Sequence, residues 1–127
     1  MLLDSNIIIY AAQPQNKDLR NFIAKNAPYI SILSYLEVLG YHRLRKDDLQ
    51  YFELFFQIAP LLPISEIVIQ KAVDLRQQRK MSLGDAVIAG TALTHDLKLV
   101  TRNVADFQWI KDLELINPFE KEDSANK

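Results

Sequence analysis

Short apolar runs along the chain alternate with longer segments in which apolar residues recur at helical spacing. The short runs predict strands at residues 1–4, 29–33, 61–64, 98–101 and 113–116. The longer segments predict helices at residues 16–26, 34–44, 47–59, 65–80 and 82–93. Parallel strands need crossover connections of about ten or more residues, which these helices provide. The pattern therefore predicts an α/β protein, a three-layer α/β/α sandwich with a mainly parallel central sheet.

Two segments are ambiguous in this pattern. SNIIIYAA (5–12) either continues the first strand or begins a helix capped by Ser5 or Asn6, and its β-branched residues favour a strand. NVADF (103–107) predicts a turn or a short helix. No internal repeat or low-complexity linker divides the sequence. We therefore expect one domain over residues 1–119, followed by a polar, disordered tail over residues 120–127.

Composition limits the class of protein. The chain has 127 residues, 49% of them hydrophobic and 24% charged, which fits one folded globular domain. It has no cysteine, which excludes disulfides and thiolate metal ligands and is consistent with a cytoplasmic location. The first residues reach Asp4 without a basic segment, and no apolar run approaches ~20 residues. We therefore expect neither a signal peptide nor a membrane span.

The overall charge balance bears on nucleic-acid binding. The formal net charge is only −1, so long-range attraction to a polyanion is absent. Any nucleic acid that this chain binds must therefore be held by local groups.

Four acids lie at predicted element boundaries. Asp4 ends the first strand, and Asp106 follows the strand at residues 98–101. Glu37 opens the helix after the second strand, and Asp85 opens the helix at residues 82–93. Because functional groups of open parallel sheets gather at the carboxyl ends of the strands, all four acids are expected to share one rim.

Helix capping is the simpler interpretation of three of these acids. SYLE (34–37), SLGD (82–85) and NVAD (103–106) each fit a capping pattern, in which the first residue accepts from a helix amide. Such a cap stabilises a helix by about 1 kcal/mol. Capping accounts neither for Asp4 nor for four acids at one rim, so the set together favours a functional site.

Four fragments in order resemble one known family. LLDSNIIIY, SYLEVLGY, GDAVIAGTAL and LVTRNVADF resemble the PIN domain, in particular the small ribonuclease toxins of VapBC toxin–antitoxin modules. Each fragment alone occurs by chance in many chains, whereas the ordered set is specific. The resemblance covers about residues 1–118. It implies a metal-dependent endoribonuclease that leaves a 5′-phosphate and a free 3′-hydroxyl.

The resemblance also assigns roles to individual residues. It makes Asp4, Glu37, Asp85 and Asp106 the catalytic acidic cluster, with Asp4, Asp85 and Asp106 as ligands of Mg²⁺ or Mn²⁺. All-oxygen ligands suit these cations, whereas zinc usually calls on cysteine or histidine. The polar residues expected to support the cluster are Ser5, Asn6, Thr101 and Asn103. Many relatives carry an acid at the position of Asn103, so the number of ligands at a second metal position stays open.

The resemblance further implies partners. The substrate is expected to be RNA, held by a local basic rim for which Arg102 and Arg43 are candidates; Arg76, Arg79 and Lys80 form another basic cluster. An antitoxin of the VapB type is expected to place a helical segment in a hydrophobic groove near the acids, and a homodimer is expected as well.

Other classes fit less well. A phosphoacceptor receiver domain or a haloacid-dehalogenase-type phosphatase would need further acids after the first strand, where this chain has Ser5 and Asn6. The remaining alternative is a PIN-like module that binds RNA or protein without cleaving, which would be expected to have lost some of the acids.

Overall fold

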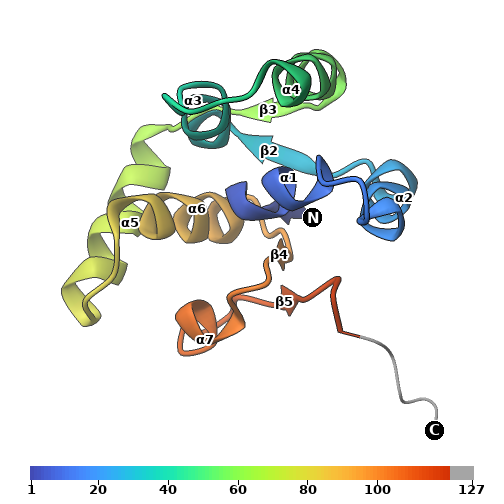
Figure 1. Cartoon of the computed structure of the whole chain (residues 1–127). Helices are drawn as coiled ribbons and strands as arrows, with labels where there is room; N and C mark the ends of the chain where they lie inside the picture. Colours follow the sequence, from blue (N-terminus) through green and yellow to red (C-terminus); the bar gives the residue numbers. More distant parts are fainter. Residues whose placement is uncertain (121–127) are drawn as a thin grey trace, which may run out of the picture.

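A single five-stranded sheet forms the centre of the molecule. The structure is a computed structural model and describes residues 1–120; the rest of the predicted tail, 121–127, lies outside the described residues. All strand pairs are parallel, in the order β3-β2-β1-β4-β5 (Figure 1). The strands are β1 (Leu2–Leu3), β2 (Tyr29–Ser31), β3 (Leu61–Leu62), β4 (Leu99–Val100) and β5 (Leu115–Ile116).

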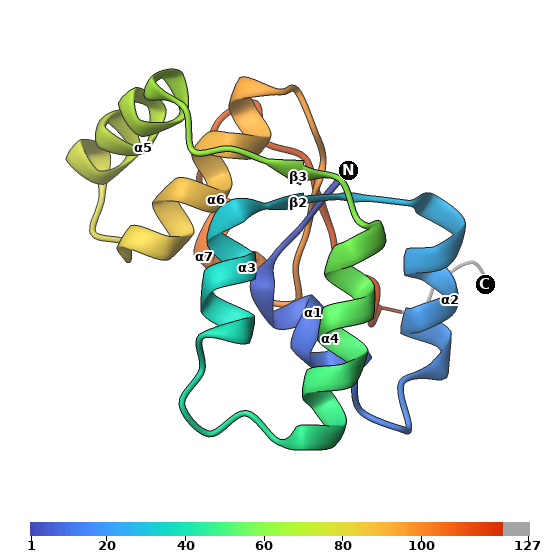
Figure 2. The ribbon, with the colours of Figure 1, turned by 90° about the horizontal axis from the view of Figure 1, so that it is seen from above.

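Helices cover both faces of this sheet. Within residues 1–120 they are α1 (Ser5–Ala11), α2 (Lys17–Asn26), α3 (Ile32–Leu39), α4 (Lys46–Ile58), α5 (Glu66–Gln78), α6 (Leu83–Thr94) and α7 (Val104–Phe107). In Figure 2, α1, α2, α3 and α4 lie below β2 and β3, whereas α5 lies on the other side with α6 beside it. The predicted three-layer α/β/α sandwich is therefore confirmed. No helix in this part of the chain is both long enough and apolar enough to cross a membrane.

Two apolar cores lie on the two faces of the sheet. Side chains alternate between faces along a strand, so Leu3 and Val100 face one core while Leu2 and Leu99 face the other. The first core contains buried residues of α1, α2, α3 and α4, including Ile7 and Phe52. The second contains buried residues of α5, α6 and α7, including Ile88 and Phe107. This division explains why the central strand β1 and its neighbour β4 are apolar throughout.

The ambiguous segment after Asp4 is a helix, so the strand that its β-branched residues favoured is wrong. In a helix, Ile7, Ile8 and Ala11 lie on one face, and all three are fully buried in the first core. Burial of this apolar face outweighs the weak strand preference of isoleucine. The strand stops at Leu3 as a result, and Asp4, in extended conformation, begins the helix at the edge of the sheet.

The helix after β2 begins earlier than predicted. It starts at Ile32 with Ser31 as its cap, whose hydroxyl accepts from the amide of Leu33, and it ends at Leu39. The predicted strand 29–33 and helix 34–44 are corrected accordingly. The capping interpretation of SYLE (34–37) is wrong because its serine lies inside the helix rather than at its start.

The other boundaries agree with the sequence patterns, except that the strands are shorter. The helices predicted at residues 16–26, 47–59, 65–80 and 82–93 are confirmed within two residues at each end. The segment 103–107 contains the short helix α7. The strands predicted at residues 61–64, 98–101 and 113–116 each keep only two residues. The central β1 is itself only two residues long, and its length limits how many residues of β2 and β4 can pair with it.

The strand order places the carboxyl ends of β1 and β4 side by side. The chain passes from β1 to β2 on one side and later returns to β4 on the other side of β1. Leu3 pairs with Val100 in the parallel register, so the residues that follow, Asp4 and Thr101, leave the sheet at the same level. Open α/β sheets bind ligands at such a reversal of strand order.

Candidate active site

Asp4 and Thr101 form a buried pair at the carboxyl edge of the sheet. The hydroxyl of Thr101 donates to Oδ2 of Asp4 at 2.9 Å. Asp4 is only 6% exposed and Thr101 is fully buried. The hydroxyl of Thr101 in turn accepts from the amide of Asn103 at 3.1 Å, which fixes its orientation. Thr101 therefore holds the Asp4 carboxylate in one position.

A chain of hydroxyl groups holds Glu37. The Ser5 hydroxyl donates to Oε1 of Glu37 at 2.6 Å and lies 2.8 Å from the hydroxyl of Ser34. Ser5 has one hydroxyl hydrogen, which Glu37 receives, so Ser34 must be the donor to Ser5. Both serines are buried, whereas Glu37 lies at the surface. Ser34 lies three residues before Glu37, on the same face of α3, and this helical spacing is the signal that the capping interpretation missed.

Gly84 provides the space into which Glu37 extends. A Cβ atom at this position would lie 3.1 Å from Oε2 of Glu37, closer than ordinary van der Waals contact. Gly84 is in the first turn of α6, directly before Asp85. A glycine lowers helix propensity, so its presence in a helical turn is a sequence signal for such a close approach. It lets the carboxylate of Glu37 come near the amino end of α6.

Asp85 has two neighbouring carboxylates. Burial raises the pKa of Asp85, and the nearby Asp106 and Glu37 raise that pKa further, while a hydrogen bond with Ser82 lowers it. The amide of Asp85 donates to the Ser82 hydroxyl at 3.0 Å, so the cap predicted at SLGD is confirmed. Asp85 is half-buried in the first turn of α6, and Asp106 is exposed on α7. Asp85 thus belongs to the acidic cluster as well as to a capped helix.

Asp4 connects this group of acids to the buried edge of the sheet. Burial raises the pKa of Asp4 to about 6, the hydrogen bond from Thr101 opposes the rise, and the charges of Asp85 and Glu37 add to it. All four predicted acids therefore lie in one region. Among residues 1–120, the only ion pair joins Lys98 and Glu114, so no Lys or Arg is paired with these acids.

The donor chemistry of this region suits a divalent cation. Carboxylates that lack a basic partner repel one another, and a hard cation with oxygen ligands relieves the repulsion. No three acidic or histidine side chains of the described residues 1–120 form a ready-made ligand set. Acidic side chains that only repel one another are expected to lie too far apart to form such a set. Asp106 is exposed, so its side chain can rotate toward a cation at the fixed Asp4.

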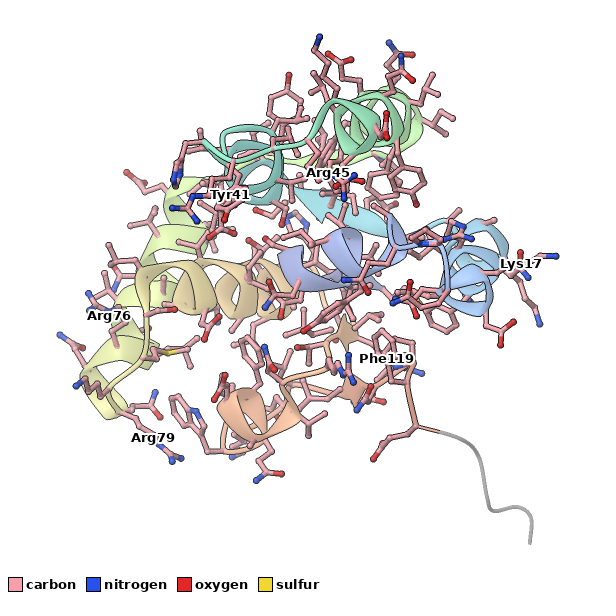
Figure 3. All side chains as sticks on the ribbon, in the orientation of Figure 1. Lys17, Tyr41, Arg45, Arg76, Arg79 and Phe119 are labelled. Carbon is pink, nitrogen blue, oxygen red and sulfur yellow. The ribbon has the colours of Figure 1, made fainter. Side chains whose placement is uncertain are left out.

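The remaining predicted site residues lie around this cluster. Asn6 is exposed on α1, and Asn103 is exposed just before α7, where its side chain makes no cap, so the capping interpretation of NVAD is wrong. Arg43 lines a cavity of about 400 Å³ that Glu37 also borders. Arg102 packs its guanidinium carbon 4.3 Å from the ring centre of Phe119, which Figure 3 labels.

Substitutions at the start of α6 separate capping from charge repulsion. Ser82→Ala is expected to lower the free energy of unfolding by about 1 kcal/mol, because it removes the acceptor of the Asp85 amide. Asp85→Asn is expected to leave the metal-free protein at least as stable, because it removes one repelling charge and keeps a similar shape. Urea unfolding with a chelator present measures both. A loss in Asp85→Asn as large as that in Ser82→Ala would identify Asp85 as a cap alone.

Comparisons with known proteins agree with this geometry. A family model described as PIN domain matches residues 1–110. The chain is 30% identical to Ribonuclease VapC1 of Rickettsia felis, over 96% of this chain and 98% of that protein. The chain belongs to the PIN domain family.

Solved structures are similar to this chain over nearly its whole length. A chain of a toxin–antitoxin complex from Klebsiella pneumoniae has a TM-score of 0.74 and 28% identity, covering 94% of this chain and 98% of that one. A chain of VapBC2 from Rickettsia felis, bound to a DNA fragment from its promoter, has a TM-score of 0.81 and 23% identity. That match covers 91% of this chain and 96% of the other and concerns the fold. The resemblance of the four sequence fragments to VapC toxins is therefore confirmed.

Proposed function

We propose that this chain is a Mg²⁺- or Mn²⁺-dependent endoribonuclease, the toxin of a VapBC-type toxin–antitoxin pair that acts in the cytoplasm. The observation that carries the proposal is the buried carboxylate of Asp4 among three further acids with no basic partner. Membership of the PIN domain family and similarity to a protein named as a ribonuclease support the same activity.

Three of the acids are proposed to bind the cation and the fourth to take part in proton transfer. Asp4, Asp85 and Asp106 would hold the cation, with Asp4 as the fixed ligand because Thr101 orients it. A bound divalent cation lowers the pKa of a coordinated water and neutralises charge on the phosphodiester. Asn6 and Asn103, exposed beside the acids, are proposed to support this group.

Glu37 is proposed to accept the proton of the attacking water. Ser5 holds its Oε1, and its Oε2 lies close to Gly84 at the amino end of α6. The water oxygen bonds to phosphorus and the bond from phosphorus to the 3′-oxygen breaks, which leaves a 5′-phosphate. The leaving 3′-oxygen takes a proton from solvent. Glu37 is exposed, so it can release the accepted proton to solvent between turnovers.

An antitoxin is proposed to dock beside Glu37. The cavity of about 400 Å³ there is lined partly by apolar groups of Ile9, Val38 and Leu44, as an amphipathic helix requires. Tyr41, which also lines it, is 54% exposed (Figure 3). A segment in this cavity would approach the acids and block access to them. The similar chain from Klebsiella pneumoniae is part of a toxin–antitoxin complex, which supports a protein partner of this kind.

A homodimer is proposed to form through α5 and α6. A groove of about 460 Å³ runs between these helices, and its lining includes Ile69, Val73 and Leu83. These side chains are 45%, 42% and 67% exposed. Contiguous exposed apolar groups of this kind mark interaction surfaces. Sedimentation of the purified chain checks the dimer.

Cleavage by the purified protein tests the proposed function. We expect cleavage of single-stranded RNA with Mn²⁺ or Mg²⁺, no cleavage with a chelator, and products that carry a 5′-phosphate. Product ends are read by their sensitivity to a 5′-phosphate-dependent exonuclease. RNA binding without cleavage under any divalent cation would instead favour the alternative, a PIN-like module that binds RNA or protein. Contacts of Arg43 and Arg102 with RNA stay predictions.

A further inference from the structure

A basic cleft opens directly beside the acids. It has a volume of about 510 Å³ and lies between the carboxyl end of α5 and α7. Asp85 and Asp106 line it together with Arg76, Arg79 and Trp109. Figure 3 labels both arginines at the end of α5, from which they extend at the surface. The cleft therefore joins positive charge, an aromatic ring and the catalytic acids in one space.

Trp109 is tied to the backbone of a catalytic residue. Its indole Nε1 donates to the carbonyl oxygen of Asp106 at 3.0 Å, which fixes the ring next to the acid. The ring is half-buried, and the guanidinium carbon of Arg79 lies 5.4 Å from its centre. A flat ring that lines a cleft and has a long cationic side chain over it is a surface on which a planar group can stack once that side chain moves.

The two arginines differ in how firmly they are held. Nε of Arg76 donates to the carbonyl oxygen of Met81 at 3.1 Å, which ties that side chain to the segment before α6. Arg79 is exposed and is held at the ring only by a cation–π contact, which is weak where the cation stays in water, so it gives way more easily. A ligand can therefore displace Arg79 from the ring while Arg76 stays in place.

We propose that Trp109 stacks against an unpaired base of the RNA substrate, with Arg79 and Lys80 at the neighbouring phosphate. This inference rests on the proposed function and names the form of RNA that the site takes. Single-strand sites combine stacking rings with a basic groove, and a base in a duplex has no free face to offer. With a net charge of only −1, the chain gains little from long-range attraction, so a stacked base provides binding that electrostatics alone does not.

Fluorescence of this residue gives a direct test. Trp109 is the only tryptophan of the chain, so its emission reports on this cleft alone. The full-length Asp4→Asn variant, which does not consume the substrate, is titrated with an oligouridylate and with an abasic oligonucleotide of the same length. We expect quenching by the oligouridylate and at least about tenfold weaker binding of the abasic strand. Equal binding of both strands would overturn the stacking.

Variants at this position separate stacking from packing. In the Asp4→Asn background, Trp109→Leu is expected to weaken binding of labelled oligouridylate roughly tenfold or more, and Trp109→Phe to retain most of it because a ring remains. Thermal melts confirm folding. If Trp109→Leu fails to fold, quenching of the native tryptophan remains the deciding measurement.

The outcomes distinguish this inference from the function on which it rests. If the wild-type protein cleaves RNA but oligouridylate does not quench Trp109, the function stands and the stacking is wrong. If the wild-type protein neither binds nor cleaves RNA with any divalent cation, both are wrong. Quenching that is equal for a hairpin duplex and for the oligouridylate would show that the cleft does not select unpaired bases.

Discussion

Asp4→Asn and Asp85→Asn are each expected to lower RNA cleavage by more than about 100-fold while the protein stays folded, since even an outer partner of a metal ligand can be worth that much. The amide has nearly the shape of the carboxylate but lacks its charge and binds a hard cation poorly. Asp4 is 6% exposed and held by Thr101, so its carboxylate has a fixed position in the site. Initial rates with Mn²⁺, measured beside circular dichroism spectra, test this expectation.

An acid outside the cluster provides the matched control. Asp18 is exposed at the start of α2, a helix on the face of the sheet opposite to α6 and α7. Asp18→Asn therefore removes the same charge without touching the site. Its cleavage rate should equal that of the wild-type protein. Metal-dependent cleavage at the wild-type rate in both Asp4→Asn and Asp85→Asn would overturn the assignment of the acids.

The second large effect is a loss of stability of the metal-free protein as the pH rises. Asp4 has a pKa of about 6 in the folded protein against an ordinary value of 3.8, so between these pH values the folded state binds more protons than the unfolded state. The contribution of Asp4 to the free energy of unfolding is therefore greatest below about pH 4. It decreases as the pH rises and is lost once the pH passes 6. The shift corresponds to about 3 kcal/mol. The raised pKa of Asp85 acts in the same direction.

Unfolding at several pH values, with a chelator present, measures this loss. The slope between pH 4 and pH 6 should be smaller in Asp4→Asn, which has no proton to lose at this position. At pH 7.5, Mn²⁺ should stabilise the wild-type protein, by about 2.7 kcal/mol at a hundred times its dissociation constant, and should stabilise Asp4→Asn far less. Parallel pH profiles of the two proteins would contradict the burial of an ionisable Asp4.

The sheet and its acidic edge could be predicted from sequence because both follow from local patterns. Short apolar runs between helical segments indicate parallel strands, and an acid directly after such a run, like Asp4, must lie at the carboxyl edge. The helix of Ser5–Ala11 could not be predicted, because burial of Ile7 and Ile8 in a core built from distant segments outweighs their strand preference.

The finer parts of the site depend on contacts across the fold. Ser34 supports the site because it hydrogen-bonds to Ser5, and Gly84 does so because Glu37 lies close to it. In each case the two residues are on different helices. Trp109 meets Arg79 only because α5 and α7 lie side by side at one end of the sheet. Spacing along the chain carries no signal for such pairs. The positions of Asp4 and Asp85 were visible because one follows a strand and the other opens a helix. Glu37 was expected to open a helix, but it lies in the last turn of α3.

The hydrogen bond between Thr101 and Asp4 joins residues 97 positions apart in the chain. During synthesis the central strand β1 is made early, but its neighbour β4 and the acid of α7 leave the ribosome only when most of the chain exists. Closing so long a loop is slow compared with local helix formation. A nascent chain therefore carries an incomplete and inactive site throughout most of translation. The proposed ribonuclease would therefore gain its complete acidic site only near the end of its synthesis.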